Sequence, residues 1–66
     1  MRISLQNARR EKNLTQQAVS NYLGMIKQAY GKIEYGTRGT SETNWIKLFN
    51  LFDGKVPLQE LMKNTI

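Results

Sequence analysis

The sequence predicts an all-α domain, a compact bundle of about five short helices. Apolar residues recur at helical spacings along most of the chain, and no segment shows the period-two alternation of a strand. Turn-forming residues separate the periodic segments, with Gly24, Gly36 and Asp53-Gly54 as the clearest breaks. A chain of 66 residues is enough for one domain, so we expect residues 1–66 to form a single domain.

The first two helices are expected in the N-terminal third of the chain. Ser4 is suited to cap the first helix, and Asn13 tolerates the left-handed conformation that ends one. Thr15 is a good N-cap for the second helix, which Gly24 then ends. The inner face of the second helix is expected to contain Val19 and Leu23.

The remaining helices follow from the same two signals, caps and apolar spacing. A third helix is expected from about Lys27 to Tyr35, where Gly36 ends it, and its inner face has Tyr30, Ile33 and Glu34. Ser41 is suited to cap a fourth, whose apolar stripe has Trp45, Leu48, Phe49 and Phe52. Pro57 suits the first position of a last helix, in which one face has Leu58, Leu61 and Met62.

The charge balance indicates a polyanionic partner. The chain has 10 Lys and Arg against 5 Asp and Glu, a net charge of +5 and a pI near 9.9. Nucleic acid is the first candidate for such a partner and an anionic membrane the second. No segment approaches the ~20 apolar residues of a membrane span, and the N-terminus shows no export signal. We therefore expect a cytoplasmic protein, in a bacterial or phage-infected cell, with no membrane partner.

The composition argues against an enzyme and against a metal site. The sequence contains no histidine, which removes the usual metal ligand and the usual general base, and no cysteine, which excludes a disulfide, a zinc cluster or an iron–sulfur site. The five carboxylates are scattered along the chain and form no catalytic pattern. We expect no enzymatic activity, no cofactor and no metal.

The stretch from Gln16 to Glu34 has the form of a helix-turn-helix: a helix, a short turn that contains glycine, and a second helix. Ser20 is small, as the point where two helices approach each other requires. Gly24 adopts a positive φ at the turn without steric cost. Tyr30 and Ile33 can pack back on the first of the two helices.

Three short segments closely resemble the helix-turn-helix of phage repressors and Cro proteins, the lambda-repressor-like or XRE family. They are Leu14-Thr15-Gln16-Gln17, Leu23-Gly24 and Ile33-Glu34-Tyr35-Gly36. The resemblance extends from about Leu5 to Met62. It implies a sequence-specific transcription regulator, a repressor of the Cro or CI kind, that binds operator half-sites in double-stranded DNA as a homodimer.

The resemblance also implies roles for individual residues. Lys27 and Gln28 match the first exposed positions of the recognition helix, which reach base edges, and Lys32 matches a position one turn later that also faces DNA. Gln can pair with adenine and Lys with guanine, each worth about 1–3 kcal/mol of discrimination. Phosphate contacts are implied for Gln16, which also braces the recognition helix, and for the loop residues Thr37 and Arg38.

Two structural roles follow from the same resemblance. Arg9 and Glu34 match a pair that joins the first and third helices by a salt bridge in several relatives. The last helix, with Leu58, Leu61 and Met62, matches a segment that often builds the dimer interface.

The sequence departs from the family pattern at four points. Ser20 replaces the usual Ala, and Tyr30 stands where Ile or Val is common, so that its hydroxyl needs a partner. Gly31 lies inside the recognition helix at a cost of about 1 kcal/mol against Ala. It either permits a close approach to DNA or loosens the helix. Gly39-Thr40 stands where a proline is frequent.

Each assignment has a simpler alternative. The polar residues of the third helix and the following loop could be a solvated surface, and the Arg9–Glu34 pair two ordinary surface charges. Leu58, Leu61 and Met62 serve equally well as monomer core. The alternative function is a protein-interaction module on the same fold, an antirepressor or antitoxin component, with a surface formed by apolar residues of the last two helices.

Overall fold

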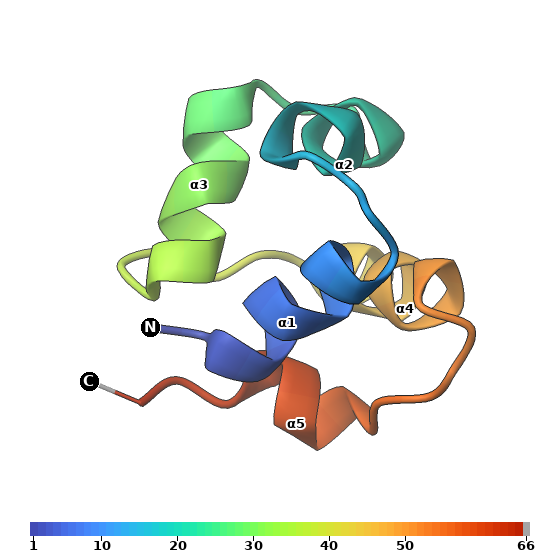
Figure 1. Cartoon of the computed structure of the whole chain (residues 1–66). Helices are drawn as coiled ribbons and strands as arrows, with labels where there is room; N and C mark the ends of the chain where they lie inside the picture. The colour runs from blue at the N-terminus through green and yellow to red at the C-terminus, as the bar shows by residue number, and fades with distance from the viewer. Residues whose placement is uncertain (66) are drawn as a thin grey trace.

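Five α-helices follow one another in the computed structural model, which describes residues 1–65. They are α1 (Ile3–Glu11), α2 (Gln16–Leu23), α3 (Lys27–Tyr35), α4 (Glu42–Leu51) and α5 (Leu58–Met62). Residues 1–65 contain no strand, so the predicted all-α fold is confirmed. In Figure 1, α2 and α3 form the upper part of the molecule, and α1, α4 and α5 form the lower part.

Side-chain caps begin two of the helices as predicted. Thr15 Oγ1 accepts a hydrogen bond from Ala18 N at 3.0 Å at the start of α2, and Ser41 Oγ accepts one from Asn44 N at 3.2 Å at the start of α4. Such caps typically contribute about 1 kcal/mol each to stability.

The predicted boundaries of α1 and α5 are each wrong by a small margin. Arg2, not Ser4, occupies the N-cap position of α1, and the Ser4 hydroxyl donates to Glu60 Oε2 instead, at 3.4 Å. Pro57 is the N-cap of α5 rather than its first helical residue. Its φ of −55° still favours the start of a helix.

Positive backbone φ angles end the helices around the turn and the loop. Gly24 follows α2 with φ 73°, and Gly36 follows α3 with φ 99°. Asn13 adopts φ 58° after α1, as predicted for a residue that tolerates the left-handed region.

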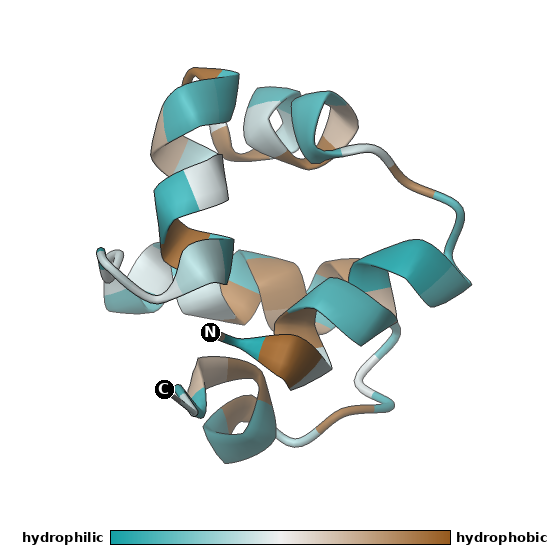
Figure 2. Cartoon of the chain, turned by 60° about the vertical axis from the view of Figure 1, so that its left-hand side comes forward, coloured by the Kyte–Doolittle hydropathy of each residue, from teal (hydrophilic) through white to brown (hydrophobic). Residues whose placement is uncertain are grey.

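One hydrophobic core holds the five helices together. Its fully or almost fully buried apolar residues are Leu5, Ala8, Val19, Leu23, Tyr30, Ile33, Trp45, Leu48, Phe52 and Leu61. Hydrophobic stretches of α1, α4 and α5 gather in the lower half of the molecule (Figure 2). The predicted stripe of α4 therefore faces inward, with Phe49 only half-buried at its edge. No helix within residues 1–65 is long and apolar enough to cross a membrane.

Candidate nucleic-acid interface

The turn between α2 and α3 fixes the angle between these two helices. Ser20 is completely buried, which lets α2 approach its neighbours closely. Met25 N donates to Ser20 O at 2.9 Å, and Gly24 N donates to Asn21 O at 3.1 Å. These bonds satisfy carbonyls at the end of α2 that would otherwise lack partners. The chain therefore leaves α2 and enters α3 along a defined path.

The helix α3 is buried on one side and exposed on the other. Tyr30 and Ile33 are inside the core, and the Glu34 side chain is 2% exposed. The exposed residues of α3 are Lys27, Gln28, Lys32 and Tyr35. The three residues predicted to contact bases therefore lie on the exposed side of one helix. This is the geometry that a helix in a major groove requires.

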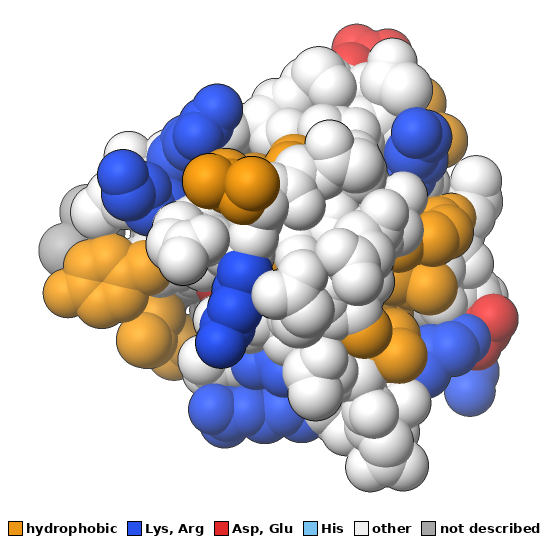
Figure 3. All heavy atoms as spheres, turned by 90° about the horizontal axis from the view of Figure 1, so that it is seen from above, with side chains coloured by type: hydrophobic (Ala, Val, Ile, Leu, Met, Phe, Trp, Pro, Cys, Tyr) orange, Lys and Arg blue, Asp and Glu red, His pale blue; other side chains and the backbone are white. Residues whose placement is uncertain are grey.

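The surface around α3 is basic because the only carboxylate of this helix, Glu34, is buried while its lysines are exposed. Between residues 15 and 40 the basic residues are Lys27, Lys32 and Arg38, and the only acidic residue is the buried Glu34. Figure 3 views the molecule from above, onto α2 and α3, and shows Lys and Arg side chains along the side of α3. Acidic side chains are seen mainly at the margins of this face. The face thus carries a surplus of positive charge, which a polyanion such as nucleic acid would attract.

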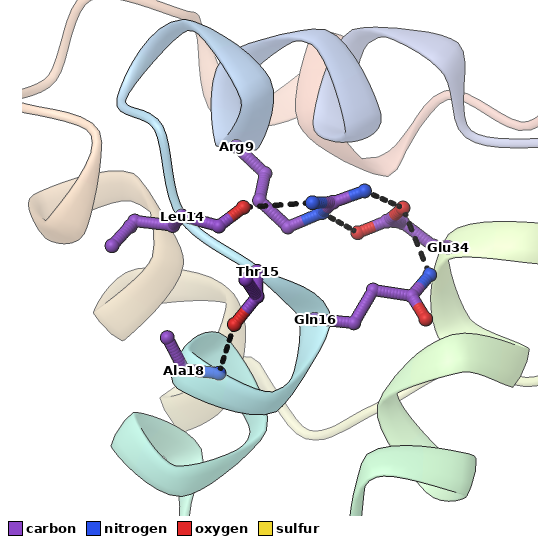
Figure 4. Close-up of polar contacts among 6 residues, drawn as sticks. All are labelled: Arg9, Leu14, Thr15, Gln16, Ala18 and Glu34. Carbon is purple, nitrogen blue, oxygen red and sulfur yellow. Dashed lines mark hydrogen bonds and ion pairs between the residues drawn. The ribbon is translucent and has the colours of Figure 1, made fainter.

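A buried ion pair connects α1 to α3 (Figure 4). Arg9 Nε donates to Glu34 Oε2 at 2.7 Å, and Arg9 Nη2 donates to Glu34 Oε1 at 3.2 Å. The third nitrogen, Arg9 Nη1, donates to Leu14 O at 2.7 Å. The guanidinium therefore engages the carboxylate with two nitrogens, which is the strongest geometry for such a pair. The pair joins α3 to the rest of the bundle.

Burial and hydrogen bonding act against each other on Glu34. Burial by itself would raise the pKa of the Glu34 carboxyl. The hydrogen bond from Arg9, the nearby hydroxyl of Tyr30, the hydrogen bond from Gln16 and the Arg9 charge together outweigh burial and hold this pKa below its ordinary value. The carboxylate is therefore ionised in the folded protein at neutral pH.

Gln16 links α2 to the same carboxylate. Its Nε2 donates to Glu34 Oε1 at 3.3 Å, and the side chain is half-buried (Figure 4). This hydrogen bond connects the first turn of α2 to α3. The Gln16 side chain also lies beside Gly31, where an added Cβ would be 3.7 Å from Gln16 Oε1.

Tyr30 places a polar hydroxyl in the core between α2 and α3. Its side chain is completely buried, and its hydroxyl makes no hydrogen bond within the described residues. Burial raises the pKa of the Tyr30 hydroxyl far above its usual range, and the nearby Glu34 carboxylate adds to this rise. The Glu34 carboxylate is the acceptor beside this hydroxyl, but no hydrogen bond of good geometry joins the two within residues 1–65.

The loop after α3 exposes both residues predicted to contact phosphate, Thr37 and Arg38. Thr37 N donates to Lys32 O at 3.1 Å, which fixes Thr37 against the end of the recognition helix. The Arg38 carbonyl accepts a hydrogen bond from Arg2 Nη1 at 2.8 Å. Positive charge is therefore available at the end of α3 as well as along it.

The three apolar residues of α5 differ in how deeply they are buried. Leu61 is completely buried, Leu58 is half-buried, and Met62 is 43% exposed. The sequence left monomer core and dimer interface open for these three residues, and for Leu61 the structure decides in favour of the core. Its side chain is already enclosed by the core of its own chain, so it has no surface left to offer a partner.

Sequence reasoning missed three residues near the recognition helix. Ile26 occupies the N-cap position of α3, makes no side-chain cap and is 69% exposed. Asn64 Nδ2 donates to Gly36 O at 2.8 Å, so the C-terminal segment supports the end of α3. Arg2 bonds to residues more than thirty positions away. No local sequence pattern indicates such long-range contacts.

Comparison with known proteins agrees with this geometry. A family model described as helix-turn-helix matches residues 5–61, most of the chain. The match begins in α1, includes α2, the turn and α3, and ends within α5. No curated protein and no solved structure matches the sequence.

Proposed function

Because the chain belongs to the XRE-type helix-turn-helix family of DNA-binding regulators, we propose that it is a repressor that recognises a specific operator. The family is one of regulators rather than of enzymes. The proposal adds three points to this membership: sequence-specific binding, action as a homodimer, and repression by exclusion of polymerase from the operator.

One observation carries the proposal. The recognition helix exposes Lys27, Gln28 and Lys32 on the side that α1 and α2 leave uncovered, while its only carboxylate is buried and neutralised by Arg9. Hydrogen-bond donors for base edges are thus combined with a surface that does not repel phosphates.

The proposed contacts follow from how a recognition helix docks. Its N-terminal end enters the major groove first, so Lys27 and Gln28 reach base edges and Lys32 lies one turn farther along. Phosphate contacts come from Gln16 at the start of α2 and from Thr37 and Arg38 after α3. These contacts set the position of the protein on the duplex, and the base contacts select the sequence.

The homodimer would place two recognition helices about 34 Å apart on one face of the DNA. The half-buried Leu58 and the exposed Met62 are the apolar α5 side chains that remain for the contact between subunits. Residues 1–66 act in this proposal as a single DNA-binding domain that needs no cofactor, in the cytoplasm of a bacterial or phage-infected cell.

Selection of bound sequences from random duplex DNA tests the proposal, followed by titration of the selected duplex at two salt concentrations. A two-fold symmetric site bound at least a thousand times more tightly than random DNA is the expected result. Weak, salt-sensitive binding without any sequence motif would contradict it.

The second candidate function is a protein-interaction module on the same fold. It is favoured by the apolar side chains that α4 and α5 expose, since Ile46 is 45% and Met62 is 43% exposed. A partner protein bound tightly by a variant that lacks the α3 charges, Lys27→Ala with Lys32→Ala, would support this function over operator binding.

A further inference from the structure

The Arg2 guanidinium joins three segments that are distant in the sequence. Arg2 Nη1 donates to Ile33 O at 2.7 Å in the last turns of α3 and to Arg38 O at 2.8 Å in the following loop. Arg2 Nε donates to Met62 O at 3.1 Å at the end of α5. One side chain thus holds the end of the recognition helix, the loop behind it and the last helix together.

Two further contacts keep Arg2 in this position. Its Cζ lies 5.2 Å from the centroid of the buried Trp45 ring, within the range of a cation–π interaction. Its backbone N donates to Glu34 O at 2.8 Å. The cation also lies at the negative C-terminal end of α3. A lysine could supply the charge, but it lacks the planar fork that reaches several carbonyls at once.

The loop depends on Arg2 because little else holds it. Among the described residues, the backbone of 38–40 makes one hydrogen bond, the one from Arg2 to the Arg38 carbonyl. A Cβ at Gly39 would meet nothing within 4 Å, so no packing restricts that residue either. Only the Thr40 hydroxyl is held, by Asn44 Nδ2 at 2.8 Å. Arg2 therefore fixes where this loop lies relative to α3.

We propose that Arg2 is a positioning residue for DNA binding, which holds Arg38 where it meets a phosphate while α3 lies in the groove. This inference rests on the proposed function, because it assumes that Arg38 contacts DNA. A loop fixed in advance loses less conformational freedom on binding, so the contact contributes more to affinity. Arg2 acts here through the backbone of Arg38.

A double-mutant cycle on the selected operator duplex tests the proposal, with Arg2→Lys, Arg38→Ala and the double variant. Arg2→Lys keeps the charge, so any change in salt dependence comes from geometry. We expect Arg2→Lys to weaken binding by roughly three- to tenfold and to flatten the salt slope by up to about one, as loss of one phosphate contact does. In the Arg38→Ala background it should change binding less than twofold.

The matched control is Arg10→Lys, the same substitution at an exposed residue of α1 for which the structure shows no side-chain hydrogen bond. It should leave affinity and salt slope unchanged. As a readout in the free protein, ¹⁵N relaxation of Arg2→Lys should show greater mobility of residues 38–40, with α2 unchanged. If Arg2→Lys does not fold, Arg2→Gln takes its place in the cycle with Arg10→Gln as its control, and the comparison then uses affinities alone because this variant also removes a charge.

The outcomes separate the inference from the function it rests on. Equal losses from Arg2→Lys in the parent and in the Arg38→Ala background, or no loss in the parent, would overturn the positioning role while operator binding stands. No operator binding by the parent protein would overturn the proposed function and this inference with it. No effect of Arg38→Ala would show that the loop contacts no phosphate, which also overturns the positioning role.

Discussion

Glu34 Oε2 in the recognition helix lies 2.7 Å from Arg9 Nε in α1, with the carboxylate only 2% exposed. Glu34 is the only acidic residue between residues 15 and 40, and Arg9 neutralises it from inside the protein. The pair therefore does two things at once. It ties α3 to the bundle, and it removes a negative charge that would repel phosphates.

Arg9→Ala should strongly destabilise the protein because it leaves the Glu34 carboxylate buried without a partner. Removal of one member of a buried pair typically costs about 3–5 kcal/mol, a large fraction of the stability of so small a domain. Urea denaturation followed by circular dichroism measures the loss. The control is Lys12→Ala at the exposed Lys12–Asp53 pair, which should leave the unfolding free energy nearly unchanged. Equal effects of the two variants would contradict the prediction.

The stability of the protein should fall in acid partly because of Glu34. The pKa of this carboxyl is lower in the folded protein than its ordinary value of 4.5. The stabilisation is therefore fully present above about pH 4.5 and is lost as the pH falls through the folded pKa. Unfolding free energies measured from pH 7 to pH 2 should decline less steeply for Glu34→Gln than for the parent. Parallel curves would show that Glu34 does not contribute.

Tyr30→Phe should stabilise the protein by roughly 1 kcal/mol. The hydroxyl is buried without a hydrogen bond in residues 1–65, and its removal recovers a desolvation cost of about 1–3 kcal/mol, less some packing. A thermal melt of the variant against the parent measures the change. A clear loss of stability would mean that the hydroxyl has a partner in solution, the Glu34 carboxylate being the nearest candidate. Operator affinity should stay the same because the side chain faces the core.

Gly31→Ala should raise the stability of the recognition helix by about 1 kcal/mol. The new Cβ would lie 3.7 Å from Gln16 Oε1, an ordinary contact distance, so no clash offsets the gain. Denaturation measures the gain, and operator titration decides the reason for the glycine. Lower affinity in a more stable protein would mean that the backbone approaches the DNA closely here. Lower stability would contradict the helix argument itself.

Gln28→Ala and Arg38→Ala should weaken operator binding in different ways. Gln28→Ala should cost about 1–3 kcal/mol on the selected operator and relax the preference at one base pair. Arg38→Ala should weaken binding to all DNA alike and flatten the salt slope by about one. Repetition of the sequence selection with each variant distinguishes the two effects. Binding equal to that of the parent in both variants would place the DNA face elsewhere.

Local signals predicted the elements well and their edges less well. The capping hydroxyls of Thr15 and Ser41 and the glycine after α3 act within four residues, so the sequence displays them directly. The N-terminus of α1 was misplaced at Ser4 because what fixes it is a contact with α3: Arg2 N bonds to Glu34 O. Such a bond leaves no mark in the sequence around it.

The sequence by itself determined the number and type of the helices, the face that each buries and the family to which the chain belongs. These properties follow from spacing, caps and charge, which act over one or two turns of a helix. Only the tertiary structure decided that Leu61 belongs to the core, that the Tyr30 hydroxyl lacks a well-formed hydrogen bond within residues 1–65, and that Arg2 contacts the loop after α3. Each of these depends on which distant segments come together, and that is settled by how the whole core packs.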